Sequence, residues 1–337
     1  MRRSPHGSHM KAPFPWFGGK RRVAAQVWNA FGDVDNYVEP FAGSLAVPLE
    51  RPASHRATCE TVNDEDRYIA NLWRAISAAP DEVARWADSP INEADLLARH
   101  RRLIATGAER IARIDDDPDW YDAKVAGWWV WGLSAWIGSG WCVSAQRQLP
   151  HLGGPGQGVH RRLPHLGDPG RGVHQPGDFV AGGSGSPDFP WNQSLCLQGE
   201  SAIYGYMRAM SARLRRVRVC CGDWSRIVTT GALNYGSTVG VFLDPPYSDD
   251  VRHPDLYASD SGTVSAEVSA WCREHGDDRR LRIALCGYEG EHDLPGWHVL
   301  SWKATGAYLG QIGNKNRHRE RIWFSPGCLV SQGRLFE

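Results

Sequence analysis

The sequence of 337 residues lacks several features that would assign a protein to a class at once. It has no apolar run near the roughly 20 residues needed to cross a bilayer, so it predicts no membrane span. Its eight cysteines are scattered, apart from the adjacent Cys220 and Cys221, which favours buried thiols in a reducing cytoplasm over a disulfide framework. Its 38 basic and 38 acidic residues cancel. We therefore expect a cytoplasmic globular protein, and we expect a monomer.

The first ten residues, MRRSPHGSHM, are basic but have no apolar segment behind them, so they do not form a signal peptide. The GSHM in this stretch resembles the remnant of a purification tag, and we exclude residues 1–10 from the fold.

Charge is distributed unevenly along the chain. Residues 139–218 hold nine arginines against four acids, a surplus of five positive charges. Such a basic middle is compatible with binding phosphates.

Strand and helix patterns alternate in two parts of the chain, which is typical of an α/β fold. They occupy residues 11–80 and 201–337, which we assign to one domain. Residues 81–200 interrupt this alternation. They include a stretch with five tryptophans (127–142) and a duplicated segment, LPHLGGPGQGVHR and LPHLGDPGRGVHQ, which we expect to form loops. We interpret residues 81–200 as an inserted region, and its tryptophans as core rather than as a stacking surface.

Four predicted strands end in polar residues that do not continue the strand. These are Glu39 in VEPFAGS, Asp64 in VNDED, Asp223 with Trp224 in CGDW, and Asp244 in LDPPY. A single acid at a strand end is more often a helix cap than a ligand. Four of them on one sheet favour a binding site, since ligands of open α/β sheets gather beyond the carboxyl ends of strands.

The order of these strand ends favours a nucleoside ligand. The glycine turn after the first strand lets the backbone approach a ligand, and an acid after the second strand suits ribose hydroxyls. The chain lacks the GxGxxG spacing and a Walker lysine, so a pyrophosphate is a poor fit. S-adenosylmethionine has a ribose, an adenine and no phosphate, and it matches this description.

PWFGGK, VEPFAGS, ND, GDW and LDPPY, in this order over residues 13–247, resemble the motifs of the Dam-like DNA adenine-N6 methyltransferases. The resemblance implies a Rossmann-like methyltransferase fold, a mostly parallel mixed sheet with helices on both faces and an inserted DNA-recognition region. It also implies methyl transfer from S-adenosylmethionine to adenine N6 in double-stranded DNA by base flipping. By the same resemblance, the cofactor-binding residues are Trp16, Lys20, Glu39, Phe41, Gly43, Asp64, Asp223, Trp224 and Asp244.

The LDPPY stretch suits the chemistry of an exocyclic adenine nitrogen, whose lone pair is delocalised into the ring. Asp244 and the carbonyl of Pro245 can each accept one N–H, which directs the lone pair towards the methyl group. Pro245 and Pro246 supply acceptors without competing N–H donors. Tyr247 offers a face on which a flipped base can stack. We therefore predict Asp244, Pro245, Pro246 and Tyr247 as catalytic residues.

The inserted region is the expected site of target recognition. We predict phosphate or base contacts by Arg147, Arg161, Arg162 and Arg171. The four histidines of the duplicated segment have no CxxC frame, so we predict no metal site. Two alternatives remain: a DNA cytosine-N4 methyltransferase, and a module that binds S-adenosylmethionine and DNA without catalysis.

Overall fold

The structure is a computed structural model that describes residues 10–14, 20–55, 59–117, 119–135, 141–142, 202–247, 261–302 and 318–329. Its strands are β1 (Asn36–Glu39), β2 (Cys59–Asp64), β3 (Val217–Cys221), β4 (Val239–Leu243), β5 (Leu281–Tyr288), β6 (His298–Ser301) and β7 (Glu320–Phe324). Its helices are α1 (Arg21–Phe31), α2 (Arg67–Ala78), α3 (Pro80–Ala87), α4 (Glu93–Arg102), α5 (Ala108–Ala112), α6 (Ala123–Ala135), α7 (Ala202–Leu214), α8 (Thr230–Leu233) and α9 (Ser261–His275). A π-helical segment at Leu103–Gly107 and short 3₁₀ turns at Pro48–Glu50, Arg113–Asp115 and Trp224–Ile227 complete the described elements.

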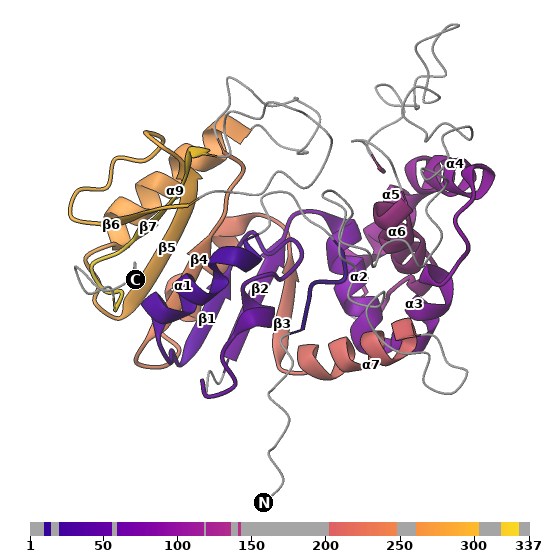
Figure 1. Ribbon diagram of the computed structural model, residues 1–337, viewed down its shortest axis with the longest axis horizontal. Coiled ribbons are helices and arrows are strands. Elements are labelled where there is room, and N and C mark those ends of the chain that lie inside the picture. Colours follow the sequence, from indigo (N-terminus) through magenta and orange to yellow (C-terminus); the bar gives the residue numbers. More distant parts are fainter. Residues whose placement is uncertain are drawn as a thin grey trace, which may run out of the picture.

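The strands form one seven-stranded sheet in the order β3-β2-β1-β4-β5-β7-β6 (Figure 1). The pairs among β1 to β5 are parallel, whereas β7 runs antiparallel to both β5 and β6. β1 and β4 are buried along their whole length, as expected for parallel strands covered on both faces. This sheet confirms the predicted α/β methyltransferase fold.

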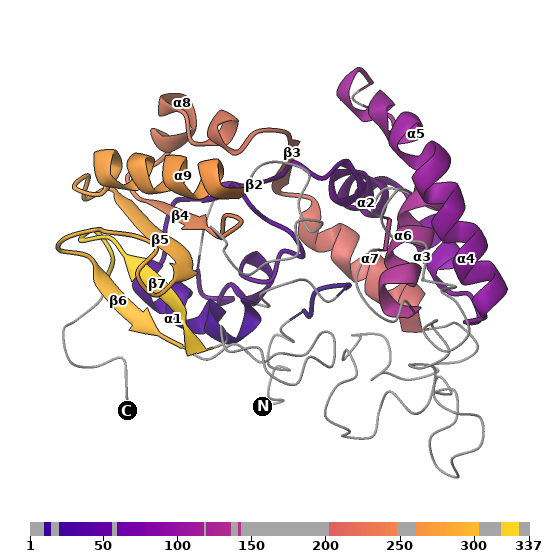
Figure 2. The ribbon, with the colours of Figure 1, turned by 90° about the horizontal axis from the view of Figure 1, so that it is seen from above.

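Helices cover both faces of the sheet. Tyr37 and Phe242 pack with α1 on one face, whereas Val38 and Val241 pack with α8 and α9 on the other face. Neighbouring residues of one strand face opposite sides, which is the period-two alternation of a strand. Figure 2 shows α8 and α9 on one side of the sheet and α1 on the other.

A second group of helices lies beyond the β3 edge of the sheet, where α2, α3, α6 and α7 share one core (Figures 1 and 2). One face of α2, with Ile69, Leu72, Trp73 and Ile76, is buried in this core. The side chain of Asp66 caps α2 by accepting the N–H of Tyr68 at 2.8 Å. α7 follows the predicted inserted region in sequence but packs with the helices that precede it. The assignment of residues 81–200 to an inserted domain stays a prediction.

Three tryptophans of the predicted aromatic stretch lie in this helical core. Trp129, Trp131 and Trp141 are at most 8% exposed. Gly132 allows the close approach of Trp141, because a Cβ at this position would collide with the indole ring. The prediction that these tryptophans are core is confirmed for these three, and Trp136 lies outside the described residues. None of the described helices is long and apolar enough to cross a membrane.

Candidate active site

The carboxyl ends of β1 and β4 lie side by side where the strand order of the sheet reverses. β1 pairs with β2 on one side and with β4 on the other. Ligands of open α/β sheets bind at such a reversal. β1 ends in Glu39, and Asp244 directly follows β4. Two of the acids predicted at strand ends therefore flank the position where the fold favours a ligand.

Lys20, which immediately precedes α1, reaches this position. Its Nζ lies 2.9 Å from Asp244 Oδ1, and only 5% of the lysine side chain is exposed. Burial alone would lower the pKa of Lys20, but attraction by neighbouring carboxylates, Asp244 first and Glu320 among the others, raises it above its usual range. The lysine is therefore a fixed positive charge at the end of β4.

The hydroxyl of Tyr247 lies between two carboxyl groups. Its Oη is 3.1 Å from Asp244 Oδ1 and 3.0 Å from Glu320 Oε2. Glu320 opens β7 and is 5% exposed. Glu320 is a site residue that was not predicted from the sequence. The only local signal is an acid at the start of an apolar strand.

The ring of Tyr247 is enclosed, with 2% of the residue exposed. Tyr288 packs edge-on against it with ring centres 4.7 Å apart, and Lys20 Nζ lies 5.2 Å from the ring centre. In this structure Tyr247 therefore contacts Asp244 and Glu320 through its hydroxyl. The stacking of a flipped base on this ring stays a prediction.

Glu39 is buried at 3% exposure beside the reversal. The hydroxyl of Tyr37, two residues earlier on β1, donates to Glu39 Oε2 at 2.9 Å. Burial raises the pKa of Glu39 well above its usual range, and the nearby charge of Asp244 acts in the same direction, against the hydroxyl of Tyr37. A cation at this position would favour the ionised form of Glu39.

The FAGS loop after β1 is tied to the end of β2 through Asp64. Gly43 has a positive φ of 45°, which favours glycine, and its N–H donates to Asp64 Oδ2 at 2.9 Å. The N–H of Asp66 donates to Oδ1 at 2.9 Å. A carboxylate offers about four acceptor positions, so these bonds leave capacity for hydroxyl donors. Burial, and then the charge of Asp66, raise the pKa of Asp64 to about 7, although the two amides act against the rise.

Asn63 holds together the loops that follow β1 and β3. Its Nδ2 donates to the carbonyl oxygens of Pro40 at 3.1 Å and Gly222 at 2.8 Å. The residue is 2% exposed. This role could not be predicted, because nothing near Asn63 in the sequence shows which two loops its side chain reaches.

The GDW motif places an exposed acid beside a buried aromatic ring. Asp223 accepts hydrogen bonds from the N–H of Ser225 at 2.9 Å and from its hydroxyl, which caps the following turn. Trp224 is 7% exposed and stacks on Phe41, with ring centres 6.1 Å apart and an interplanar angle of 26°. Trp271 makes an edge contact with Trp224. The structure thus brings the FAGS and GDW motifs together.

Comparison with known proteins finds one family that is similar to the N-terminal part of the chain. Residues 16–99 match the model of D12 class N6 adenine-specific DNA methyltransferases. Over residues 16–99 of its 337 residues, the chain is similar to this methyltransferase family. A search of curated proteins finds no match. The family match confirms the predicted adenine-specific DNA methyltransferase and favours N6 of adenine over N4 of cytosine.

The match covers only part of the predicted site. It includes Trp16, Lys20, Glu39, Phe41, Gly43 and Asp64. It ends before β3 and β4, so the GDW and DPPY motifs lie beyond it. Their place in the site rests on the geometry of the strand ends.

Some predicted site residues lie outside the described residues. These are Trp16 and the four arginines of the inserted region, Arg147, Arg161, Arg162 and Arg171. The histidines of the duplicated segment lie outside them as well. Within the described ranges, no three His, Cys, Asp or Glu side chains are grouped to hold a metal ion.

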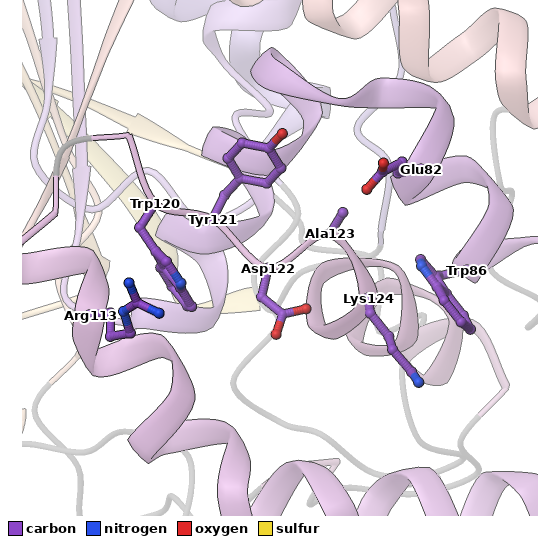
Figure 3. Close-up of a pocket in the computed structure, with 8 residues that line it drawn as sticks. All are labelled: Glu82, Trp86, Arg113, Trp120, Tyr121, Asp122, Ala123 and Lys124. Atoms are coloured by element: carbon purple, nitrogen blue, oxygen red, sulfur yellow. The ribbon is translucent and has the colours of Figure 1, made fainter.

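A pocket of about 380 Å³ lies in the helical group, away from the strand ends (Figure 3). Its lining is Glu82, Trp86, Arg113, Trp120, Tyr121, Asp122, Ala123 and Lys124. The Nζ of Lys124 lies 4.6 Å from the centre of the Trp86 ring, a cation–π distance. Two acids balance two bases in this lining, so its charge gives no preference for the phosphates of DNA.

Proposed function

We propose that the chain transfers a methyl group from S-adenosylmethionine to N6 of an adenine flipped out of double-stranded DNA. The observation that carries this proposal is the grouping at the strand reversal: Asp244 is paired with Lys20, and Glu39 lies at the neighbouring strand end. The family match supports adenine N6 as the acceptor. The cofactor, the form of the DNA and the role of each residue are parts of the proposal.

The charges of the site fit a cationic cofactor. Asp244 and Glu320 lie near Lys20, and Glu39 lies near Asp244, so carboxyl groups outnumber cations among the described residues of the site. The sulfonium of S-adenosylmethionine supplies both a positive charge and the methyl group to be transferred. Its binding would favour ionised Glu39, against the burial that raises the pKa of this residue.

Other residues at the strand ends would hold the nucleoside part of the cofactor. Asp64 retains acceptor capacity for ribose hydroxyls beside the glycine turn at Gly43. Phe41 and Trp224 form a stacked aromatic pair suited to a flat base, and the exposed Asp223 would accept from its amino group. Lys20 would act through its charge, by holding Asp244.

Asp244 and Pro245 would act on the target nitrogen. The hydrogen bonds of Asp244 to described residues go to Oδ1, from Lys20 and Tyr247, and none within the described part of the chain reaches Oδ2. Oδ2 can then accept one N–H of the adenine amino group, while the carbonyl of Pro245 accepts the other. Catalysis under this proposal consists of positioning and electrostatic stabilisation by preorganised acceptors.

The segment that follows α6, which holds Arg147, Arg161, Arg162 and Arg171, would bind the DNA and recognise the target sequence. Phosphate contacts by arginine supply affinity and register, and contacts in the grooves supply sequence preference. We therefore retain residues 81–200 as the proposed target-recognition region.

The test is methylation of DNA with labelled S-adenosylmethionine, followed by digestion and separation of the nucleosides. Genomic DNA from a host that lacks adenine methylation offers every short target sequence. We expect label in N6-methyladenine, more from double-stranded than from denatured DNA, and about 10²–10³ times less with the Asp244→Asn variant. Label in N4-methylcytosine, or no label with folded protein, would reject the proposal.

A further inference from the structure

The carboxylate of Asp244 lacks the backbone donor that usually orients an acid at the end of a strand. Acids in such turns are commonly held by the backbone N–H two residues further on. Here the next two residues are Pro245 and Pro246, which carry no N–H. Asp223 shows the contrast, because Ser225 holds it with both its N–H and its hydroxyl. The carboxylate of Asp244 must therefore be oriented by side chains from elsewhere.

Two such side chains contact Oδ1 of Asp244. Lys20 Nζ lies 2.9 Å away and Tyr247 Oη lies 3.1 Å away. The ammonium is a point charge on a flexible stem, whereas the phenol is fixed by its ring, which is 2% exposed and packs against Tyr288. The direction of the Tyr247 hydroxyl therefore decides how well Asp244 is held.

We propose that Glu320 is a positioning residue for methyl transfer, which acts on Asp244 through the hydroxyl of Tyr247. Glu320 Oε2 lies 3.0 Å from Tyr247 Oη, which is also 3.1 Å from Asp244 Oδ1. A phenol has one proton, so it donates to one carboxylate at a time and is held between the two. The second carboxyl group keeps the hydroxyl oxygen in place while Asp244 engages the substrate.

The sheet explains how a residue from the far end of the chain reaches this position. β7 runs antiparallel to β5, so its first residue lies where the parallel strands end, with Glu320 paired to Tyr288. The N–H of Trp302 donates to the Glu320 carbonyl at 3.3 Å, and the N–H of Glu289 donates to the carbonyl of Arg319 at 2.7 Å. Glu320 is thus mounted on rigid backbone, as preorganisation of a site requires.

Glu320 also contributes to the charge at the site. Its attraction is one of the causes that raise the pKa of Lys20. Removing it therefore lowers the pKa of Lys20 and takes away one hydrogen-bond partner of Tyr247. The inference rests on the proposed methyl transfer, because it assigns Glu320 a part in orienting the same acceptor.

A double-mutant cycle tests the inference. Glu320→Leu and Tyr247→Phe should each lower single-turnover kcat about tenfold or more, the scale of one hydrogen bond to a charged group, with KM for DNA and cofactor changed less than about threefold. The double variant should be no slower than the slower single variant, because Glu320 acts through Tyr247. Glu320→Gln, whose amide oxygen still accepts from the phenol, should retain more kcat than Glu320→Leu. Glu289→Gln changes an exposed acid directly after β5, which pairs with Arg321 at 2.9 Å, and is the matched control with unchanged kcat.

The cycle also has a readout without substrate. The free energies of unfolding of the four proteins should show a favourable coupling between Tyr247 and Glu320. The inference would be overturned if the loss of kcat in the double variant equalled the product of the two single losses. An unchanged kcat in folded Glu320→Leu would also overturn it. If Glu320→Leu does not fold, Tyr247→Phe decides alone, since full activity without the hydroxyl excludes any action through it. If the wild-type protein does not methylate adenine, the proposed function is rejected instead. The coupling measured by unfolding would then still test the contact between Tyr247 and Glu320.

Discussion

Arg213 on α7 donates to Glu60 on β2 with both terminal nitrogens of its guanidinium. Nη1 lies 2.6 Å from Oε2 and Nη2 lies 2.8 Å from Oε1, while Arg51 approaches Oε1 at 2.7 Å. Glu60 is 3% exposed. Such bidentate pairs are directional, so this one fixes the helical group against the sheet.

Glu60→Gln should therefore lower the free energy of unfolding by about 3 kcal/mol, the lower part of the range for removing one partner of a buried ion pair. The lower part applies because Arg51 and Arg213 are each about a fifth exposed and can be hydrated. Denaturation by urea measures the change. Asp81→Asn, which breaks the exposed Arg208–Asp81 pair of the same helix α7, should change stability by less than about 1 kcal/mol. Equal effects of the two substitutions would mean that the buried pair has no special part in joining α7 to the sheet.

Asp244→Asn should keep the fold and lose most of the activity. The amide has nearly the shape of the carboxylate but accepts with only one atom and carries no charge. Removing one preorganised electrostatic partner lowers kcat by about 10²–10³. Single-turnover methylation measures the rate, with circular dichroism to verify folding. Asp293→Asn, an exposed acid in the loop after β5, is the control. A folded Asp244→Asn protein that retains more than about a tenth of the wild-type rate would show that Asp244 is not the acceptor of the amino proton.

The arginines of the duplicated segment should act on DNA. Replacing Arg161, Arg162 and Arg171 with glutamine should weaken DNA binding and reduce the salt dependence by about one unit of slope for each arginine that neutralises a phosphate in the wild-type complex. Fluorescence anisotropy at several salt concentrations gives this slope. The control removes the same charge from exposed positions elsewhere, at Arg22, Arg273 and Arg279. If both triple variants reduce the slope equally, the effect reflects net charge rather than binding by the duplicated segment.

Much of the site could be predicted because strand ends are local features. Apolar runs followed by proline, glycine or acids located Glu39, Asp64, Asp223 and Asp244, and the structure finds each within two residues of the end of a strand. The parallel order then places Glu39 and Asp244 side by side. This part of the site follows from the order of the segments along the chain.

The residues that sequence analysis missed depend on contacts between distant segments. Glu320 lies 73 positions from Tyr247, and its place depends on the antiparallel direction of β7. Asn63 bonds to Gly222 across 159 positions. β6, only four residues long, was also missed, since a short edge strand has too little alternation to reveal it. No local pattern specifies these partners.

Asp64 should make cofactor binding depend on pH. Its pKa is raised to about 7, first by burial and then by the charge of Asp66. The ionised carboxylate is the stronger acceptor for ribose hydroxyls, and it forms as the pH rises through about 7. Affinity for S-adenosylmethionine should therefore increase from about pH 5.5 to about pH 8.5, as measured by isothermal titration calorimetry.

Asp64→Asn is the variant that tests this, because asparagine keeps the shape and does not titrate. Its affinity should be roughly ten- to a hundredfold weaker at pH 8.5, the scale of a hydrogen bond to a charged group, and the rise with pH should disappear. The free energy of unfolding should change with pH in the opposite direction to the affinity for S-adenosylmethionine. A raised pKa in the folded state means that folded wild type binds the extra proton, so its free energy of unfolding should fall as the pH rises from about 4 to about 7. The Asp64→Asn protein should lack that fall, and an equal pH dependence of binding in both proteins would assign the titration to another group.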